Sequence, residues 1–149
     1  MPDDDRPKDC GCIDRDADPI RFAREVVGGC DPFASSLGIS IDEVADSYAR
    51  VSLTIQNTYC NAEGRTHGAV IFSLADEAFA VAANSRGITA FALEIKINYL
   101  QASGPGDTIS AEATPIDIRK RVSLWNVDLT NQDGERIAVA QGMAYHIHR

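Results

Sequence analysis

Hydrophobic residues recur with two different periods along this chain, and the change of period separates helices from strands. Helical spacing of the apolar residues over 20–27 predicts a first short helix, which a Gly-Gly pair ends. A second short helix is expected between Asp31, an N-cap followed by Pro32, and Gly38, which stops it. The chain therefore begins its folded part with two small helices.

Alternation of apolar and polar residues predicts strands on both sides of a long helix. Two runs, from Ile39 to Val44 and from Tyr48 to Ile55, are joined by a hairpin near Asp46. Three or four further strands are expected after residue 87, within Ile88 to Leu100, Thr108 to Ile116, Val122 to Thr130 and Ile137 to Ile147. The turn formers at 131–134 predict a hairpin between the last two.

Between these groups of strands, residues 57–66 read as a loop, and residues 68–85 are apolar on nearly every side of a helix. A helix that is hydrophobic all round is a buried helix. The order of elements predicts an α+β domain in which an antiparallel sheet curls around that helix.

Composition limits the classes of function. The chain has 149 residues, the size of one domain, and a net charge of −8, which argues against nucleic acid as a partner. Residues 1–18 hold seven Asp against three Lys or Arg, so we expect a disordered acidic leader before a folded domain at 19–149. No apolar run is long enough to cross a bilayer and no signal peptide is evident, so we expect no membrane association and a cytoplasmic protein.

The four cysteines predict reduced thiols, because a disulfide framework belongs to small secreted domains. Cys30 and Cys60 are expected to be small hydrophobic residues. Cys10 and Cys12 form one pair of possible zinc ligands without a second pair, so no metal site is expected.

Two acidic side chains interrupt the buried helix, Asp76 and Glu77. A buried carboxylate is costly unless it is paired or used, and the two lie about 100° apart, so one apolar surface cannot cover both. Either they share a solvent-facing seam or one has a chemical role. Gly68 begins the helix, where a free N–H either binds a developing oxyanion or only belongs to a tight turn.

Two polar residues precede the helix. The Asn61 amide either hydrogen-bonds a substrate carbonyl or water, or forms a loop turn. His67 either orients the loop or an acyl group, or is structural.

These residues occur in the order Asn61, Gly64, His67-Gly68, then Leu74-x-Asp-x-Ala-x-Ala, followed by Ile97-Asn98-Tyr99-Leu100, Gly106-Asp107 and Gly142-x-x-x-Tyr145. The pattern resembles the hotdog-fold acyl-CoA thioesterases of the phenylacetate-degradation (PaaI-like) type over residues 32–148. The resemblance implies hydrolysis of a small, medium-chain or aryl acyl-CoA without metal or cofactor. It implies that Asp76 is the nucleophile or general base and that Gly68 N–H polarises the thioester carbonyl. Asn61 and His67 would assist, and Glu77 would face solvent.

One helix cannot supply the whole of this site. Gly68 and Asp76 are eight residues apart, about 12 Å along a helix axis, so both cannot reach one carbonyl carbon. Two helices packed antiparallel about a two-fold axis would bring Asp76 of one chain to the helix start of the other. We therefore predict a homodimer, assembled into a homotetramer, with shared sites.

The basic residues Arg119, Lys120 and Arg121 form a turn that is either solvated or receives the phosphates of coenzyme A. The chain departs from the family pattern at Ala69, where relatives have a second glycine, and at Ala92, where some have Ser or Thr. Two rival functions stay open, a non-catalytic acyl-CoA-binding protein and a hotdog dehydratase or hydratase.

Overall fold

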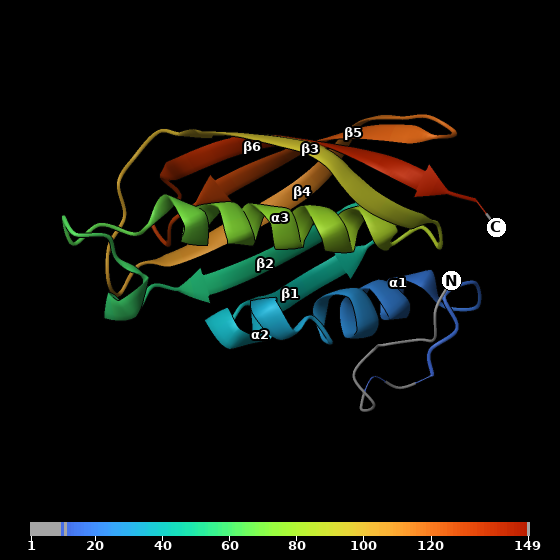
Figure 1. The fold of residues 1–149 in the computed structure, drawn as a ribbon, viewed down its shortest axis with the longest axis horizontal. Helices are drawn as coiled ribbons and strands as arrows, with labels where there is room; N and C mark the ends of the chain where they lie inside the picture. Colours follow the sequence, from blue (N-terminus) through green and yellow to red (C-terminus); the bar gives the residue numbers. More distant parts are fainter. Residues whose placement is uncertain (1–9, 11, 149) are drawn as a thin grey trace.

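One antiparallel sheet with a long helix across it makes up the fold (Figure 1). The structure is a computed structural model that describes residues 10 and 12–148. The strands lie in the order β1-β2-β4-β5-β6-β3. They are β1 (Ser40–Ala45), β2 (Tyr48–Thr54), β3 (Thr89–Tyr99), β4 (Thr108–Ile118), β5 (Val122–Thr130) and β6 (Arg136–Ile147). The predicted α+β architecture is confirmed, with strand ends within two residues of expectation.

Two helical segments precede the sheet and pack near β1 and the central helix α3 (Gly68–Asn84). The predicted first helix is divided into α1 (Pro19–Phe22) and a π-helical turn, η1 (Ala23–Gly28). The predicted second helix is α2 (Pro32–Leu37). Its N-cap Asp31 accepts a hydrogen bond from Ala34 N–H at 2.8 Å, and Gly38 ends it in the left-handed conformation at φ 78°. Here the capping residues alone located the element.

The core forms where α3 lies against the sheet. Phe79 packs edge-on to Trp125 of β5, and a β-carbon placed on Gly142 of β6 would lie 3.0 Å from the Phe79 ring. The absence of a side chain at Gly142 therefore lets the helix approach the sheet closely. Burying Phe79 contributes roughly 1.5–3 kcal/mol.

The prediction that α3 is buried on every side is wrong for the single chain. Ala69 is exposed, and Phe72, Ser73, Asp76 and Ala80 are only half-buried, whereas the opposite face of the helix is fully covered. The alanine-rich sequence allows both faces to pack closely, but the sheet of one chain covers only one of them. In Figure 1 the helix α3 lies in front of the sheet.

The strand β3 forms an edge of the sheet, paired only with β6. Its apolar side chains are poorly covered, with Phe91 52% and Leu93 59% exposed. A register shift between Ala92 and Glu94 marks a β-bulge opposite β6. This eleven-residue edge strand has unpaired backbone groups and exposed apolar side chains, so another strand could pair with it.

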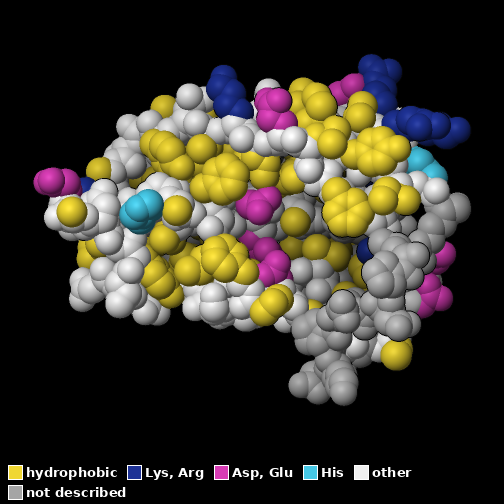
Figure 2. Space-filling model, viewed as in Figure 1, with side chains coloured by type: hydrophobic (Ala, Val, Ile, Leu, Met, Phe, Trp, Pro, Cys, Tyr) yellow, Lys and Arg dark blue, Asp and Glu magenta, His cyan; other side chains and the backbone are white. Residues whose placement is uncertain are grey.

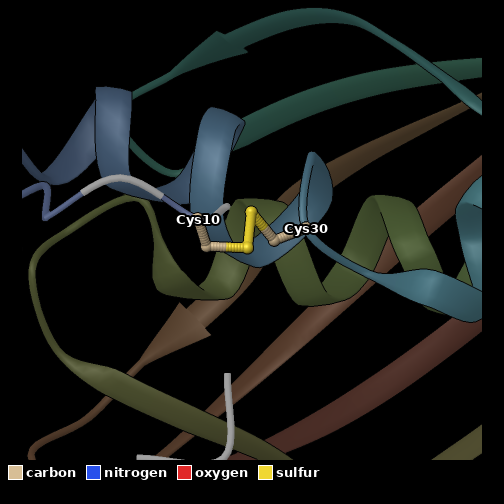
Figure 3. The surroundings of a disulfide bond; sticks show 2 residues. All are labelled: Cys10 and Cys30. Atoms are coloured by element: carbon tan, nitrogen blue, oxygen red, sulfur yellow. A yellow bond between two sulfur atoms is a disulfide. The ribbon is translucent and has the colours of Figure 1, made fainter. Parts of the chain in front are cut away.

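The expectation of reduced cysteines is wrong at one pair, because Cys10 and Cys30 form a disulfide (Figure 3). The bond joins the N-terminal segment to the chain just before α2, and it encloses α1 and η1. The prediction of thiols rested on the rule that disulfide frameworks are typical of small secreted domains. The fold nevertheless places the Cα atoms of Cys10 and Cys30 6.0 Å apart, a distance that a disulfide spans. Cys12 and Cys60 are free.

Most of the predicted leader, residues 1–9 and 11, lies outside the described residues. Of the described part, the Asp18 side chain caps α1 by accepting from Arg21 N–H, and the Arg15 guanidinium lies 4.4 Å from the centre of the Phe22 ring. None of the described helices combines the length and hydrophobicity that a bilayer crossing requires.

Candidate active site

Three of the four predicted residues lie in the loop at 60–66 or at the start of α3 that follows it. His67 is the N-cap of the helix, and its Nδ1 accepts a hydrogen bond from Ala69 N–H at 3.1 Å. The His67 N–H donates to the Tyr59 carbonyl at 2.8 Å. His67 therefore fixes the angle at which the chain enters α3, and its imidazole is in use as a capping acceptor.

Gly68 follows as the first residue of α3. Among the described residues, no acceptor takes a hydrogen bond from its N–H, whereas the Tyr99 hydroxyl donates to its carbonyl at 2.9 Å. A β-carbon on Gly68 would lie 3.2 Å from both Cζ and Oη of Tyr99. This position therefore combines a free donor at the positive end of a helix with space that only glycine leaves open.

Asn61 serves the loop with its amide oxygen. The Oδ1 atom accepts hydrogen bonds from Glu63 N–H at 3.0 Å and Arg65 N–H at 3.1 Å, which makes Asn61 a turn former. Its side-chain NH₂ donates to no acceptor in the described part of the chain, and the residue is exposed. The two readings from the sequence are thus compatible, because different atoms of the amide carry them.

Asp76 lies on the open face of α3, half-buried and without a hydrogen-bond partner among the described residues. Burial raises the pKa of this carboxyl, and the negative charge of Asp31 raises it further. A carboxylate with a raised pKa is a stronger base than an ordinary aspartate, which suits it to accept a proton. Figure 2 shows acidic side chains in the middle of this face with hydrophobic side chains on either side.

The expectation that Glu77 faces solvent is wrong. Its side chain is buried, with 7% of the residue exposed, and none of the residues that the structure describes hydrogen-bonds to its Oε1 atom. Burial first, and then the charges of Asp31 and Asp76, raise the pKa of Glu77 to about 8. Glu77 is buried because the N-terminal helical segments pack against α3. The sequence pattern did not predict this packing.

Asp76 does not join the other three residues within one chain. It follows Gly68 by eight residues on the continuous helix α3, so the distance along the axis is about 12 Å, as expected from the sequence. The start of α3 instead borders a cavity of about 380 Å³, whose lining includes Arg65, Gly68, Tyr99 and Ser103. One chain thus holds two separate parts of a site.

The basic turn lies at the opposite end of β3 from Gly68. The Arg121 carbonyl accepts from His146 N–H, near the start of β3, whereas Tyr99, which contacts Gly68, ends that strand. Arg119 binds Asp117 at 2.7 Å through Nε, while Lys120 and Arg121 line a cavity of about 300 Å³. Within the described part of the chain no carboxylate pairs with Lys120 or Arg121, so these two residues have free cationic groups beside the cavity.

Two residues near the site were not assigned to it from the sequence. Asp31 was expected only to cap α2, and its effect on Asp76 follows from packing between distant elements. Tyr99 was noted as part of a motif, but nothing in a strand pattern shows that its hydroxyl reaches Gly68, 31 residues away.

Comparison with known proteins places these features in a family. Residues 63–138 match the family model of the thioesterase superfamily. A putative esterase of Archaeoglobus fulgidus is 34% identical over 118 residues, which are 79% of this chain and 77% of that protein. The acyl-coenzyme A thioesterase PaaI of Escherichia coli is 33% identical over 117 residues, 78% of this chain and 84% of that protein.

Solved structures agree with this result. The structure of the Escherichia coli PaaI protein from the phenylacetic acid degradation operon matches with a TM-score of 0.83 and 30% identity, over 87% of this chain and 96% of that one. A variant of the phenylacetic acid degradation protein PaaI from Thermus thermophilus matches with a TM-score of 0.76 and 29% identity, over 78% and 100% of the two chains. The expected hotdog fold is confirmed.

Proposed function

Because this chain belongs to the thioesterase superfamily and is a thioester hydrolase, we propose that it cleaves acyl-CoA thioesters at a site shared by two chains. The observation that carries the site assignment is the unbonded N–H of Gly68, at the start of α3 and beside a cavity. Asp76 of a second chain is the basic group. The acyl group is small, medium-chain or aryl.

The chemistry follows from the groups present. As the carbonyl carbon is attacked, negative charge develops on its oxygen, and the Gly68 N–H stabilises that charge. The Asn61 NH₂ is a second donor. If Asp76 acts as a base, it takes a proton from water, the hydroxide adds to the carbonyl, the C–S bond breaks and the proton passes to the CoA sulfur. If Asp76 attacks directly, the C–S bond breaks, the CoA thiolate leaves and an anhydride forms. Water then hydrolyses the anhydride, which restores the Asp76 carboxylate and supplies the proton that the thiolate takes up.

Dimerisation through the β3 edge completes the site. Antiparallel pairing of two β3 strands would join the sheets and bring the open faces of two α3 helices together, so that the exposed Phe91 and Leu93 are covered. Within one chain Gly68 and Asp76 are about 12 Å apart along α3. When two α3 helices pack antiparallel, Asp76 of one chain lies beside Gly68 of the other. Two such dimers would form the tetramer.

The same pairing supports a position for the coenzyme. Antiparallel β3 strands place the start of one strand beside the end of the other, so Lys120 and Arg121 of one chain approach Gly68 of its partner. Their cationic groups suit the phosphates of CoA. His67 supports the site by capping the helix that carries the oxyanion donor.

Release of the CoA thiol from a panel of thioesters, acetyl through palmitoyl plus phenylacetyl and benzoyl, tests the proposal. Asp76→Ala should lower kcat by several orders of magnitude while the variant still binds acyl-CoA. Asp42→Ala, which removes an exposed carboxylate on β1, is the matched control and should turn over normally. Wild-type turnover by Asp76→Ala would overturn the assignment of Asp76.

A further inference from the structure

We propose that Tyr99 is a positioning residue for thioester hydrolysis, which holds the first peptide of α3 so that the Gly68 N–H points at the developing oxyanion. The inference rests on the proposed function, because it assigns a role to the support of the Gly68 donor. Tyr99 is not itself assigned a contact with the substrate, and it acts through the carbonyl of Gly68.

The contact between the two residues has two parts. The Tyr99 hydroxyl donates to the Gly68 carbonyl at 2.9 Å, and the phenol ring lies so close that a β-carbon on Gly68 would be 3.2 Å from Cζ. The hydrogen bond fixes the direction of the carbonyl, and the ring limits lateral movement of the α-carbon. The last residue of β3 thereby fixes the first residue of α3.

The helix itself does not require this hydrogen bond. Only the last four carbonyls of an α-helix lack intrahelical partners, and Gly68 is at the other end. The Tyr99 side chain is also accessible, since 53% of the residue is exposed, so water could satisfy its hydroxyl. Neither the Gly68 carbonyl nor the Tyr99 hydroxyl needs this hydrogen bond in order to be satisfied. Its main effect is therefore on the orientation of the Gly68 peptide group and not on the stability of the helix.

The backbone groups next to the Gly68 N–H are engaged. His67 Nδ1 takes the next N–H, that of Ala69, and the His67 N–H binds the Tyr59 carbonyl. Val70 N–H donates to the His67 carbonyl at 2.9 Å. With Tyr99 on the Gly68 carbonyl, the peptide groups on both sides of the free donor are held, which is the preorganisation that makes an oxyanion donor effective.

The test is a comparison of Tyr99→Phe with wild type on the best thioester substrate. Loss of the hydroxyl alone should lower kcat about tenfold, with KM changed less than about twofold and an unchanged melting temperature. Tyr48→Phe, which removes a phenol hydroxyl on β2, is the control and should leave kcat unchanged. A wild-type kcat for Tyr99→Phe, or an effect confined to KM, would overturn the inference.

A double-mutant cycle with Gly68→Ala provides a readout that a purely structural role would not move. The added β-carbon meets the Tyr99 ring and hydroxyl, so the two substitutions disturb the same contact. The double variant should therefore lose clearly less kcat than the product of the two single losses. Independent, multiplicative losses would contradict the coupling.

Asp76→Ala is measured in the same series to separate the two proposals. If Asp76→Ala is inactive and Tyr99→Phe is fully active, only the role of Tyr99 fails. If Asp76→Ala keeps wild-type turnover, the proposed function of the site fails, whatever Tyr99→Phe does.

Discussion

Asp31 caps α2 with its carboxylate and also raises the pKa of Asp76 on α3, in addition to the larger effect of burial. One side chain therefore serves both the local structure of a six-residue helix and the electrostatics of the proposed base. The two roles are separable, because asparagine caps a helix as well as aspartate does but carries no charge.

Asp31→Asn should move the acid limb of the pH profile of kcat/KM to lower pH. Removal of the negative charge lowers the pKa of Asp76, so the carboxylate is available as a base at more acidic pH. The melting temperature should change little. Asp42→Asn, at an exposed position, is the control for a general effect of net charge, and an acid limb that stays in place in Asp31→Asn would contradict the prediction.

Glu77 predicts a pH dependence of stability. Its pKa is about 8 in the folded protein and about 4.5 as an ordinary glutamate, so the folded state binds more protons between these values. The contribution of Glu77 to the free energy of unfolding is therefore fully present below pH 4.5 and is lost as pH rises through about 8. The loss is on the order of a few kcal/mol.

Urea unfolding at pH 5, 7 and 9 measures this effect. Glu77→Gln keeps the shape of the side chain without its charge, so its unfolding free energy should depend less on pH and should exceed that of wild type at pH 9. Glu63→Gln, at an exposed loop position, should keep the wild-type dependence. Parallel pH curves for wild type and Glu77→Gln would show that Glu77 does not cause the effect.

The two carboxylates also show what a sequence can predict about this site. The helix, its start at Gly68 and the separation of Gly68 from Asp76 all follow from periodicity and helix geometry. The burial of Glu77 does not, because it depends on how helices at residues 19–37 pack against a helix some forty residues later. Local patterns define an element and its faces, but not which neighbour covers each face.

Asn61→Asp separates the two functions of the amide. The substitution keeps an oxygen that accepts from Glu63 and Arg65 N–H, and removes the NH₂ donor. We expect a melting temperature close to that of wild type and a kcat reduced about tenfold or more. Asn61→Ala should also have a lower melting temperature, because it loses the accepting oxygen. A wild-type kcat in Asn61→Asp would show that Asn61 only forms the turn and has no part in catalysis.

Leu93→Lys should separate the chains and abolish turnover together. The lysine places a charge on the exposed apolar edge of β3, where the proposed dimer buries Leu93. Ile116→Lys on β4, where the native side chain is similarly exposed at 51%, is the matched control and should keep the β3-paired dimer and its turnover. Sedimentation velocity and thiol release on the same samples decide the matter, and a monomer with full kcat would refute a shared site.

As at the site, the local features of the fold were predictable from the sequence and the contacts between distant residues were not. Turn and cap residues such as Asp31 and Gly38 located their elements correctly, because the chemistry that ends a helix is local. The disulfide at Cys30 and the contact between Tyr99 and Gly68 were not predictable in the same way. Each joins residues that only the tertiary arrangement brings together.

The disulfide between Cys10 and Cys30 makes the start of the molecule a closed covalent ring that contains α1 and η1. A protease that cuts the chain between Ile13 and Gly29 opens this ring without dividing the molecule, and the two pieces stay attached until a reductant is added. Cleavage and loss of the N-terminal segment are therefore two separate events, and the second depends on the thiols in the surroundings.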